Sequence, residues 1–470
     1  MEALFDNGLS GGSLVLLFVC LFAALAFEFV NGFHDTANAV ATVIYTNSLR
    51  PNVAVVLSGV FNFLGVFAGG ISVAMGIMKL LPVELLVAGG PGVGLAMVLA
   101  LLFGAIVWNV GTWYFGLPSS SSHTLIGSII GVGIAHSLTP GHTFGEGVNW
   151  SKAADIGVSL LVSPMVGFSA AFLIFVLMRK YARNRALVEP PVGDAPPPRG
   201  TRAILVGTCT AVSFAHGSND GQKGVGLVML ILIGLLPAGF ALNPDASADS
   251  LARARAAAVA VDATLAKHAD VGGAEEVGKA RALLTDLSTR LEGRSAVTEI
   301  PADARFAVRQ DILLIDRAVS KLVDGGHLGL SDSERATLES NRKALRAPTE
   351  YAPTWVLVAI ALALGIGTMV GWKRIVVTVG EKIGKAHLTY GQGMAAEMVA
   401  ASAIGFASVS GLPVSTTHVL SSGIAGTMVA QRAGLNERTV RSIAAAWLLT
   451  LPASMVLAGG AFWLLRLVLA

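Results

Sequence analysis

The chain has 470 residues, of which 53% are hydrophobic and 13% charged, whereas about a quarter of the residues in an average soluble domain are charged. This composition excludes an ordinary soluble enzyme, and the dispersed net charge of +3 excludes a nucleic-acid-binding protein. Both cysteines, Cys20 and Cys209, lie in apolar runs and predict neither a disulfide framework nor a cysteine metal site. We therefore expect an all-α polytopic membrane protein.

Apolar runs long enough to cross a bilayer follow one another along the chain. They cover residues 13–33, 52–81, 92–115, 154–178, 201–214 continued through 221–242, 354–372, 394–410 and 440–469. About eight to twelve crossings result. The first run lacks a basic flank before it, so we expect a retained span and not a cleaved signal. Two shorter runs, 125–135 and 419–430, each follow Gly-Leu-Pro and a Ser/Thr cluster, and they predict half-helices in re-entrant hairpins.

Residues 243–353 differ from the rest of the chain, because they hold 32 of its 63 charged residues. Apolar side chains at helical spacing in this segment predict a small all-helical insert. The proline-rich linker 182–200 has basic flanks, and the segment 373–385 has four basic residues and one acidic residue. Basic loops favour the cytoplasm. We expect both segments to be cytoplasmic and the insert, one crossing away, to be extracytoplasmic.

Two patterns occur twice and indicate an internal repeat. The segment Gly116–His123 resembles Gly411–His418, and the segment around Asp35 resembles the one around Asp220. The number of residues between the two members of a pair is larger for the Gly-Leu-Pro segments than for the aspartate segments. The difference is about the length of the insert. We expect a first repeat over 1–181 and a second over 201–242 and 354–470. The loop assignments place the starts of the two copies on opposite sides, so the repeats are expected to be inverted, with helices that break beside the aspartates.

Ionisable side chains inside apolar runs are functional candidates, because charge in hydrocarbon is costly. Asp35 and Asp220 occupy the same position in the two copies, and Asn38 corresponds to Lys223. The second copy thus has the Lys223 ammonium, a covalently fixed cation, at the position where the first copy has the Asn38 amide. The alternative is that the two carboxylates only hold the fold together.

Hydroxyl side chains precede both predicted half-helices. They are Ser120, Ser121, Ser122, Ser415, Thr416 and Thr417. Helix starts at membrane depth present unpaired N–H groups and a positive dipole end, so two of them with hydroxyl donors would bind a tetrahedral oxyanion. Alternatively, the hydroxyls only satisfy backbone groups at a kink. His123 and His418, next in the sequence, either orient the caps or relay protons.

Three further ionisable residues lie in or beside the apolar runs. Glu28 and Glu397 either carry a coupling proton or have a structural role, and His34 is a proton or metal partner for Asp35. The sequence contains no Walker-type loop, nucleophile elbow or metal-ligand spacing. We therefore expect neither ATP hydrolysis nor catalysis.

These motifs resemble those of the inorganic phosphate transporter (PiT) family. The resemblance rests on Gly32-Phe-His-Asp-Thr-Ala-Asn-Ala-Val-Ala-Thr42, on His216-Gly-Ser-Asn-Asp-Gly-Gln-Lys-Gly224 and on the two Gly-Leu-Pro segments. It implies a homodimeric inverted-repeat protein that holds phosphate between the duplicated motif (Asp35, Asn38, Asn219 and Asp220) and the hydroxyl clusters. His34 and Lys223 depart from the sodium-coupled pattern. They are similar to the bacterial low-affinity branch, which moves phosphate with protons, often as a neutral complex with a divalent metal.

The sequence therefore predicts a bacterial inner-membrane importer of inorganic phosphate that works by proton symport and alternating access. It has no resident cofactor, although Asp35 and Asp220 could transiently bind Mg²⁺ or Ca²⁺ that travels with phosphate. Sodium coupling and sulfate transport are the alternatives within this class. An anion channel, or a nutrient receptor whose insert binds a partner, are the alternatives outside it. The lipid bilayer and a second copy are the expected partners, and nucleic acid is not.

Overall fold

The computed structural model describes residues 11–35, 37–81, 90–181, 185–191, 193, 195–268 and 274–469. All regular elements among them are helices, apart from one isolated bridge between Gly384 and Leu435. The chain divides into two compact units. The insert unit spans Leu232–Ala352, and the body consists of Gly12–Ile231 and Pro353–Ala470.

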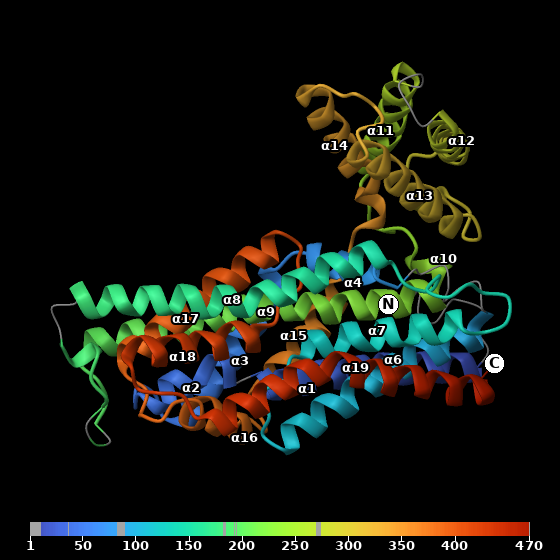
Figure 1. Cartoon of the computed structure of the whole chain (residues 1–470). Coiled ribbons are helices and arrows are strands. Elements are labelled where there is room, and N and C mark those ends of the chain that lie inside the picture. Colours follow the sequence, from blue (N-terminus) through green and yellow to red (C-terminus); the bar gives the residue numbers. More distant parts are fainter. Residues whose placement is uncertain are drawn as a thin grey trace. The chain divides into compact units, whose positions relative to one another are not determined.

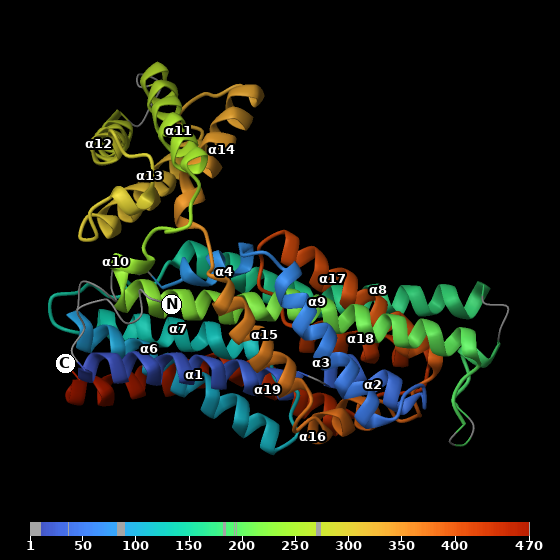
Figure 2. The same ribbon diagram turned by 180° about the vertical axis from the view of Figure 1, so that it is seen from behind.

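The body is a bundle of helices of very different lengths that lie side by side (Figures 1 and 2). Its helices are α1 (Gly11–Asp35), α2 (Ala37–Tyr45), α3 (Pro51–Ala68), α4 (Ser72–Met78), α6 (Gly90–Tyr114), α7 (Ser121–Ser137), α8 (Trp150–Tyr181), α9 (Arg199–Leu235, which continues into the insert unit), α15 (Thr354–Thr368), α16 (Lys373–Val377), α17 (Tyr390–Val409), α18 (Thr416–Gln431) and α19 (Glu437–Leu469). Single π and 3₁₀ turns at Thr378–Lys382 and Arg185–Leu187 complete it. The expected membrane-type all-helical architecture is confirmed.

Five segments of the described chain are long and apolar enough to cross a membrane, which is fewer than the expected eight to twelve crossings. One predicted crossing forms a helix that is too short, since α15 has 15 residues. Helices α9 and α17 have 37 and 20 residues, but they carry charged side chains such as Asp220 and Glu397. A full span needs about 20 residues. The run predicted over 52–81 is divided into α3 and α4.

Both aspartates lie on helices of the body. In the first copy, Asp35 is on α1. In the second copy, α9 continues through Asp220 without interruption. The prediction of a broken helix beside Asp220 is therefore wrong. The glycines around Asp220 do not open the helix. Instead, they allow α9 to pack closely against α3.

That close packing is clearest at two glycines. A Cβ on Gly217 of α9 would lie 2.1 Å from the carbonyl oxygen of Asn62, and one on Gly65 of α3 would lie 2.2 Å from that of Phe214. Ser213 donates a hydrogen bond of 2.9 Å to Ser58 in the same crossing. Only glycine allows backbones to approach so closely, so this pattern fixes how α3 and α9 cross.

The short helices α7 and α18 are built alike. Ser120 caps α7 by accepting a hydrogen bond from the His123 N–H, and Ser415 caps α18 by accepting one from the His418 N–H. Helix α7 packs on α6 and α19, whereas α18 packs on α17 and α8. Each capped start therefore lies between helices from both halves of the sequence.

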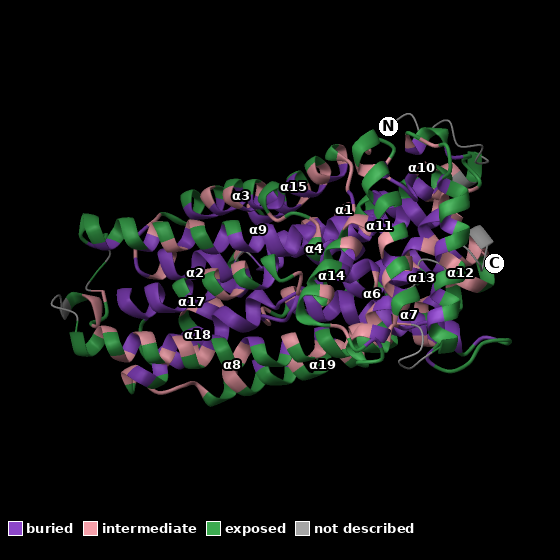
Figure 3. Ribbon diagram, turned by 90° about the horizontal axis from the view of Figure 1, so that it is seen from above, coloured by how far each residue is buried: buried purple, intermediate pink, exposed green. Residues whose placement is uncertain are grey.

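The body has its apolar side chains on the outside as well as the inside. Figure 3 shows exposed residues along the outer sides of α8 and α19 and buried ones between the helices. Phe406, Leu448 and Leu467 are 76%, 78% and 83% exposed. Such a surface is suited to lipid and not to water.

The insert unit contains four main helices: α11 (Ala248–Lys267), α12 (Ala274–Leu291), α13 (Arg305–Asp324) and α14 (Asp332–Arg346), with the short α10 (Pro237–Phe240) before them. Leucine and valine side chains at helical spacing form its core. Ser331 begins α14 with a capping box that includes Glu334. This is the construction of a soluble helical domain.

Candidate functional site

The residues of the duplicated motifs meet the starts of α7 and α18 in the interior of the body. Asp35 ends α1, Asn38 lies in the first turn of α2, and Asp220 and Lys223 lie one turn apart on α9. These four residues are at most 3% exposed. Residues far apart in the sequence thus form one buried polar cluster, as the repeat analysis predicted.

Asp35 is the point where the two capped helices meet. Its Oδ2 accepts a hydrogen bond of 2.9 Å from Ser121 Oγ of α7, and its Oδ1 accepts one of 2.7 Å from Thr417 Oγ1 of α18. Asn38 Nδ2 donates to the same Oδ1 at 3.3 Å. One carboxylate therefore holds both helix starts.

Asn38 and the hydroxyls of α18 extend this contact. Asn38 Nδ2 lies 2.9 Å from Thr417 Oγ1 and 3.3 Å from Thr416 Oγ1. The amide oxygen of Asn38 has no hydrogen-bond partner among the described residues. The amide is thus held on one side and has a free acceptor on the other.

Lys223 makes the corresponding contacts in the second copy. Its Nζ donates to Asp220 Oδ1 at 2.7 Å, to Ser122 Oγ of α7 at 2.5 Å and to the carbonyl oxygen of Val414 at 3.2 Å. A buried charge is tolerated when it is paired and hydrogen-bonded. Lys223 thus compensates one of the two aspartates and reaches the segments that begin both short helices.

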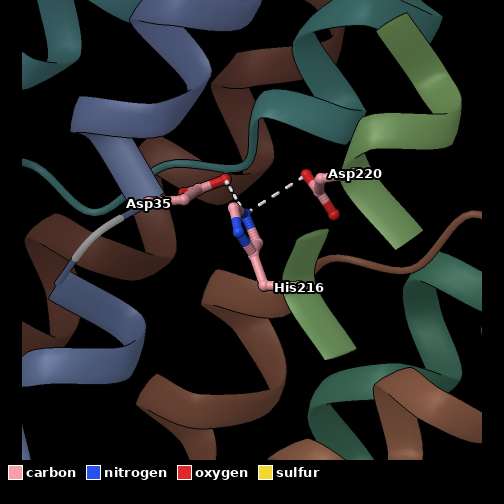
Figure 4. A group of neighbouring side chains, drawn as sticks. All are labelled: Asp35, His216 and Asp220. Carbon is pink, nitrogen blue, oxygen red and sulfur yellow. Dashed lines mark ion pairs between the residues drawn. The ribbon is translucent and has the colours of Figure 1, made fainter. Parts of the chain in front are cut away.

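His216, which the sequence analysis quoted only as part of a motif, lies between the two aspartates (Figure 4). Its Nε2 is 3.7 Å from Asp35 Oδ2 and 3.7 Å from Asp220 Oδ2. Its Nδ1 is 2.7 Å from Asn62 Oδ1, which fixes the ring. The sequence signal was the spacing, because residues four apart share a helix face, and His216 precedes Asp220 by one turn of α9.

These three residues could hold a cation. One ligand atom each from Asp35, His216 and Asp220 lies within 4.8 Å of the others. Asp220 Oδ2 and His216 Nε2 have no hydrogen-bond partner among the described residues. Two carboxylates and an imidazole are ligands for divalent metals. The predicted pair of aspartates is thus joined by a third ligand.

Two residues of the motifs support the cluster from its edge. His34 Nδ1 lies 3.3 Å from Asp35 Oδ1, and His34 Nε2 lies 3.1 Å from Thr112 Oγ1. The Asn219 side chain donates a hydrogen bond to the Leu412 carbonyl at 3.2 Å and accepts one from the Val414 N–H at 3.3 Å. It therefore positions the segment before α18.

The two predicted glutamates lie apart from each other. Glu28 is fully buried, packs against Gly224, and accepts a hydrogen bond of 3.4 Å from Asn31. Glu397, also fully buried, accepts hydrogen bonds from the hydroxyls of Thr42 and Thr208. Glu28 thus lies against the residue that follows Lys223 on α9, whereas Glu397 occupies a separate polar site.

The two histidines after the caps contact each other. The His123 and His418 rings are 4.5 Å apart between centroids, and His418 stacks on Trp447 at 4.0 Å. Trp447 Nε1 donates to the carbonyl oxygen of Pro118 at 2.9 Å. The rings therefore join α7 to α18 beside the cluster.

The chain matches a known protein family over most of its length. Residues 31–458 match the phosphate transporter family. The chain is 44% identical to the low-affinity inorganic phosphate transporter PitA of Escherichia coli (strain K12) and 43% identical to PitB of the same organism, over 96% of each chain. A solved structure described as the sodium-dependent phosphate transporter has the same fold, with a TM-score of 0.56 and 19% identity over 97% of this chain and 100% of its own.

The family match covers most of the chain, and the described helices include five apolar segments long enough to span a membrane. Both findings favour a carrier in the cell membrane over an enzyme. The chain belongs to the phosphate transporter family, as a multi-pass membrane protein.

Proposed function

We propose that the protein is a low-affinity importer of inorganic phosphate that moves its substrate together with protons by alternating access. The observation that carries this proposal is the convergence of Ser121, Thr417 and Asn38 on Asp35, beside Lys223. Hydroxyl, amide and ammonium donors at two helix starts suit a tetrahedral oxyanion.

Proton coupling follows from competition for these donors. Ionised Asp35 accepts hydrogen bonds from Ser121 and Thr417, which are donors that phosphate would also need. A protonated carboxyl accepts more weakly and can itself donate. Protonation of Asp35 therefore releases hydroxyls to phosphate and removes one negative charge from the loaded site. A proton and a phosphate are thus favoured together.

The metal ligands support a second part of the proposal, in which phosphate travels as a neutral complex with a divalent cation. Asp35, His216 and Asp220 supply the ligand atoms. A divalent cation and the phosphate dianion cancel in charge, which lowers the cost of moving the complex through a buried site. Oxygen ligands suit Mg²⁺ and Ca²⁺, and the imidazole extends the range to Mn²⁺ and Zn²⁺.

Alternating access rests on two inverted repeats that exchange their contacts. Helix α7 packs on α19, and α18 packs on α8. Each short helix therefore packs against the last long helix of the other half. Movement of these two helix pairs against the rest of the body would open the cluster to one side at a time. The homodimer implied by the family resemblance is part of this proposal, and mass photometry of the purified protein tests it.

The extracytoplasmic position of the insert is also part of the proposal. A single accessible cysteine at Val259, which is 65% exposed on α11, tests it in whole cells. Labelling by a membrane-impermeant maleimide before lysis is expected. Labelling only after lysis would place the insert in the cytoplasm.

Uptake of labelled phosphate into proteoliposomes tests the central proposal. The arms are an imposed proton gradient with sodium absent, the same gradient with Mg²⁺, and the same gradient with excess sulfate. We expect accumulation that needs the proton gradient, rises with Mg²⁺ and ignores sulfate. Sulfate cannot donate a hydrogen bond to either aspartate, whereas the hydrogen phosphate ion can. Uptake only after sodium is added, or strong inhibition by sulfate, would contradict the proposal.

A further inference from the structure

A pocket lies at the C-terminal end of α6. It has a volume of about 650 Å³ and is formed by residues 113–116 on one side and residues 371–382 on the other. The C-terminal end of α6 lies beside α16 here (Figures 1 and 2). None of the residues described above as ligands or donors of the aspartate cluster line this pocket.

The pocket is strongly basic. Lys373, Arg374 and Lys382 line it, and no acidic residue is among its lining residues. In the part of the chain that the structure describes, the side-chain ammonium groups of Lys373 and Lys382 form no salt bridge or hydrogen bond. Three cations without a carboxylate in the same cavity are suited to an anion.

Aromatic rings complete the walls. Trp113, Tyr114, Phe115 and Trp372 line the pocket, and Tyr114 and Phe115 are 58% and 74% exposed. The Arg374 guanidinium lies 4.9 Å from the Tyr114 ring centroid and 5.2 Å from that of Trp113. Because α6 is long and apolar enough to span a membrane, we expect its end at the interface, where aromatic belts and basic residues meet lipid headgroups.

We propose that this pocket binds the phosphate headgroup of an anionic phospholipid. The ammonium groups of Lys373 and Lys382 contact the phosphodiester, and the exposed rings of Tyr114 and Phe115 contact the glycerol and the first part of the acyl chains. The exposed aromatic rings favour a lipid over free phosphate, because only the lipid has an apolar part that can pack against them. The positive charge agrees with the cytoplasmic leaflet expected for this segment.

The lipid would act on the segment that leads to the aspartate cluster. Arg374 Nη1 donates to the Tyr114 carbonyl at 2.9 Å, and Thr378 Oγ1 donates to the Gly116 carbonyl at 2.8 Å. The chain then continues through Pro118 to the cap of α7 at Ser120. A bound headgroup therefore stabilises the entry to one of the two capped helices.

Native mass spectrometry of the full chain, released from nanodiscs of phosphatidylcholine and phosphatidylglycerol, tests the proposal. The test variant is Lys373→Gln with Lys382→Gln. The control is Lys180→Gln with Arg438→Gln, which removes the same charge from exposed positions outside the pocket. We expect the test variant to retain one phosphatidylglycerol fewer per protomer than the wild type and the control.

Equal retention of phosphatidylglycerol by the test variant and the control would overturn the proposal. A second arm adds millimolar inorganic phosphate to the wild type before release. Loss of the same lipid in that arm would assign the pocket to free phosphate and would also overturn it. Both readouts report binding alone, so they are independent of whether transport is proton-coupled.

Discussion

The body and the insert are both helical, but their side chains are distributed in opposite ways. In the insert, the core consists of aliphatic side chains, mostly leucine and valine. The buried charged residues among those described are limited to Arg309, Asp316 and Arg342, and ion pairs lie on the surface. In the body, hydrocarbon covers the outside, while carboxylates, an ammonium and hydroxyls lie in the middle. Water stabilises the first arrangement and lipid the second. Polarity in the interior of the body is therefore a sign of function.

The largest expected effect is the loss of one partner of the buried pair in the body. Lys223→Gln or Asp220→Asn leaves an uncompensated charge or unpaired polar group and should lower the free energy of unfolding by about 3–5 kcal/mol. Phosphate uptake should fall to background in both variants. Thermal unfolding in detergent and proteoliposome uptake measure the two effects.

The double variant separates folding from transport. Asp220→Asn with Lys223→Gln removes both charges at once, so the melting temperature should recover toward the wild type. Uptake should stay at background, because the fixed cation and one carboxylate are gone. Wild-type uptake by this variant would show that the pair serves only the fold.

A charge placed on each surface compares the two regions directly. Val456→Asp on α19, at a site 74% exposed, should cost about 2.5–3.5 kcal/mol on insertion into a bilayer. Val259→Asp in the insert, at a site 65% exposed, should stay within about 0.5 kcal/mol of the wild type. Yield of folded protein in membranes measures both. Equal yields would mean that the surface of the body does not face lipid at Val456.

The α3 and α9 crossing gives a smaller but well-controlled effect. Gly217→Ala places a methyl group against the Asn62 carbonyl and should destabilise the body by about 1–3 kcal/mol through overpacking. Gly207→Ala on the same helix has open space around it and should be neutral or slightly stabilising. Melting temperatures of the two variants should differ accordingly, and equal values would contradict the close crossing.

The smallest expected effect lies in the capping box of the insert. The Lys267 ammonium and the Ser331 hydroxyl and N–H lower the pKa of Glu334 from 4.5 to about 2. Its contribution to stability is therefore fully present above pH 4.5 and is lost as the pH falls toward 2. Ser331→Ala should cost about 1 kcal/mol of local stability. Hydrogen exchange of peptides from α14 in the full chain, corrected for the intrinsic rate at each pH, measures both effects. Unchanged exchange in Ser331→Ala would contradict the role of the cap.

Much of the cluster could be predicted because its residues occur twice. The duplicated Gly-Leu-Pro and aspartate motifs identified Asp35, Asn38, Asp220, Lys223 and the hydroxyls in advance. His216 was missed because the first copy has Asn31, and not a histidine, at the same distance before its aspartate. The pairing of Asp35 with Thr417 was also beyond sequence reasoning, since it depends on how helices from opposite ends of the chain pack.

The fold was less predictable where glycine has two possible meanings. Glycines near Asp220 were interpreted as points where a helix opens, yet α9 is continuous. Local sequence does not distinguish a glycine that releases the backbone from one that admits a neighbouring helix. The number of long apolar helices was also harder to predict, since an apolar run such as the one that forms α15 gives a helix of only 15 residues.

The glycine contacts between α3 and α9 also restrict how the protein can move. Carbonyl groups of each helix fit against glycines of the other, and His216 is bound to Asn62 across the same crossing. Sliding of one helix along the other would drive these carbonyls into side chains. In the alternating-access cycle proposed above, the two helices would therefore travel as one rigid piece and carry His216 and Asp220 with them. The boundary between the moving parts would then lie at contacts that can break and re-form, such as the hydroxyl contacts of α7 and α18 with Asp35.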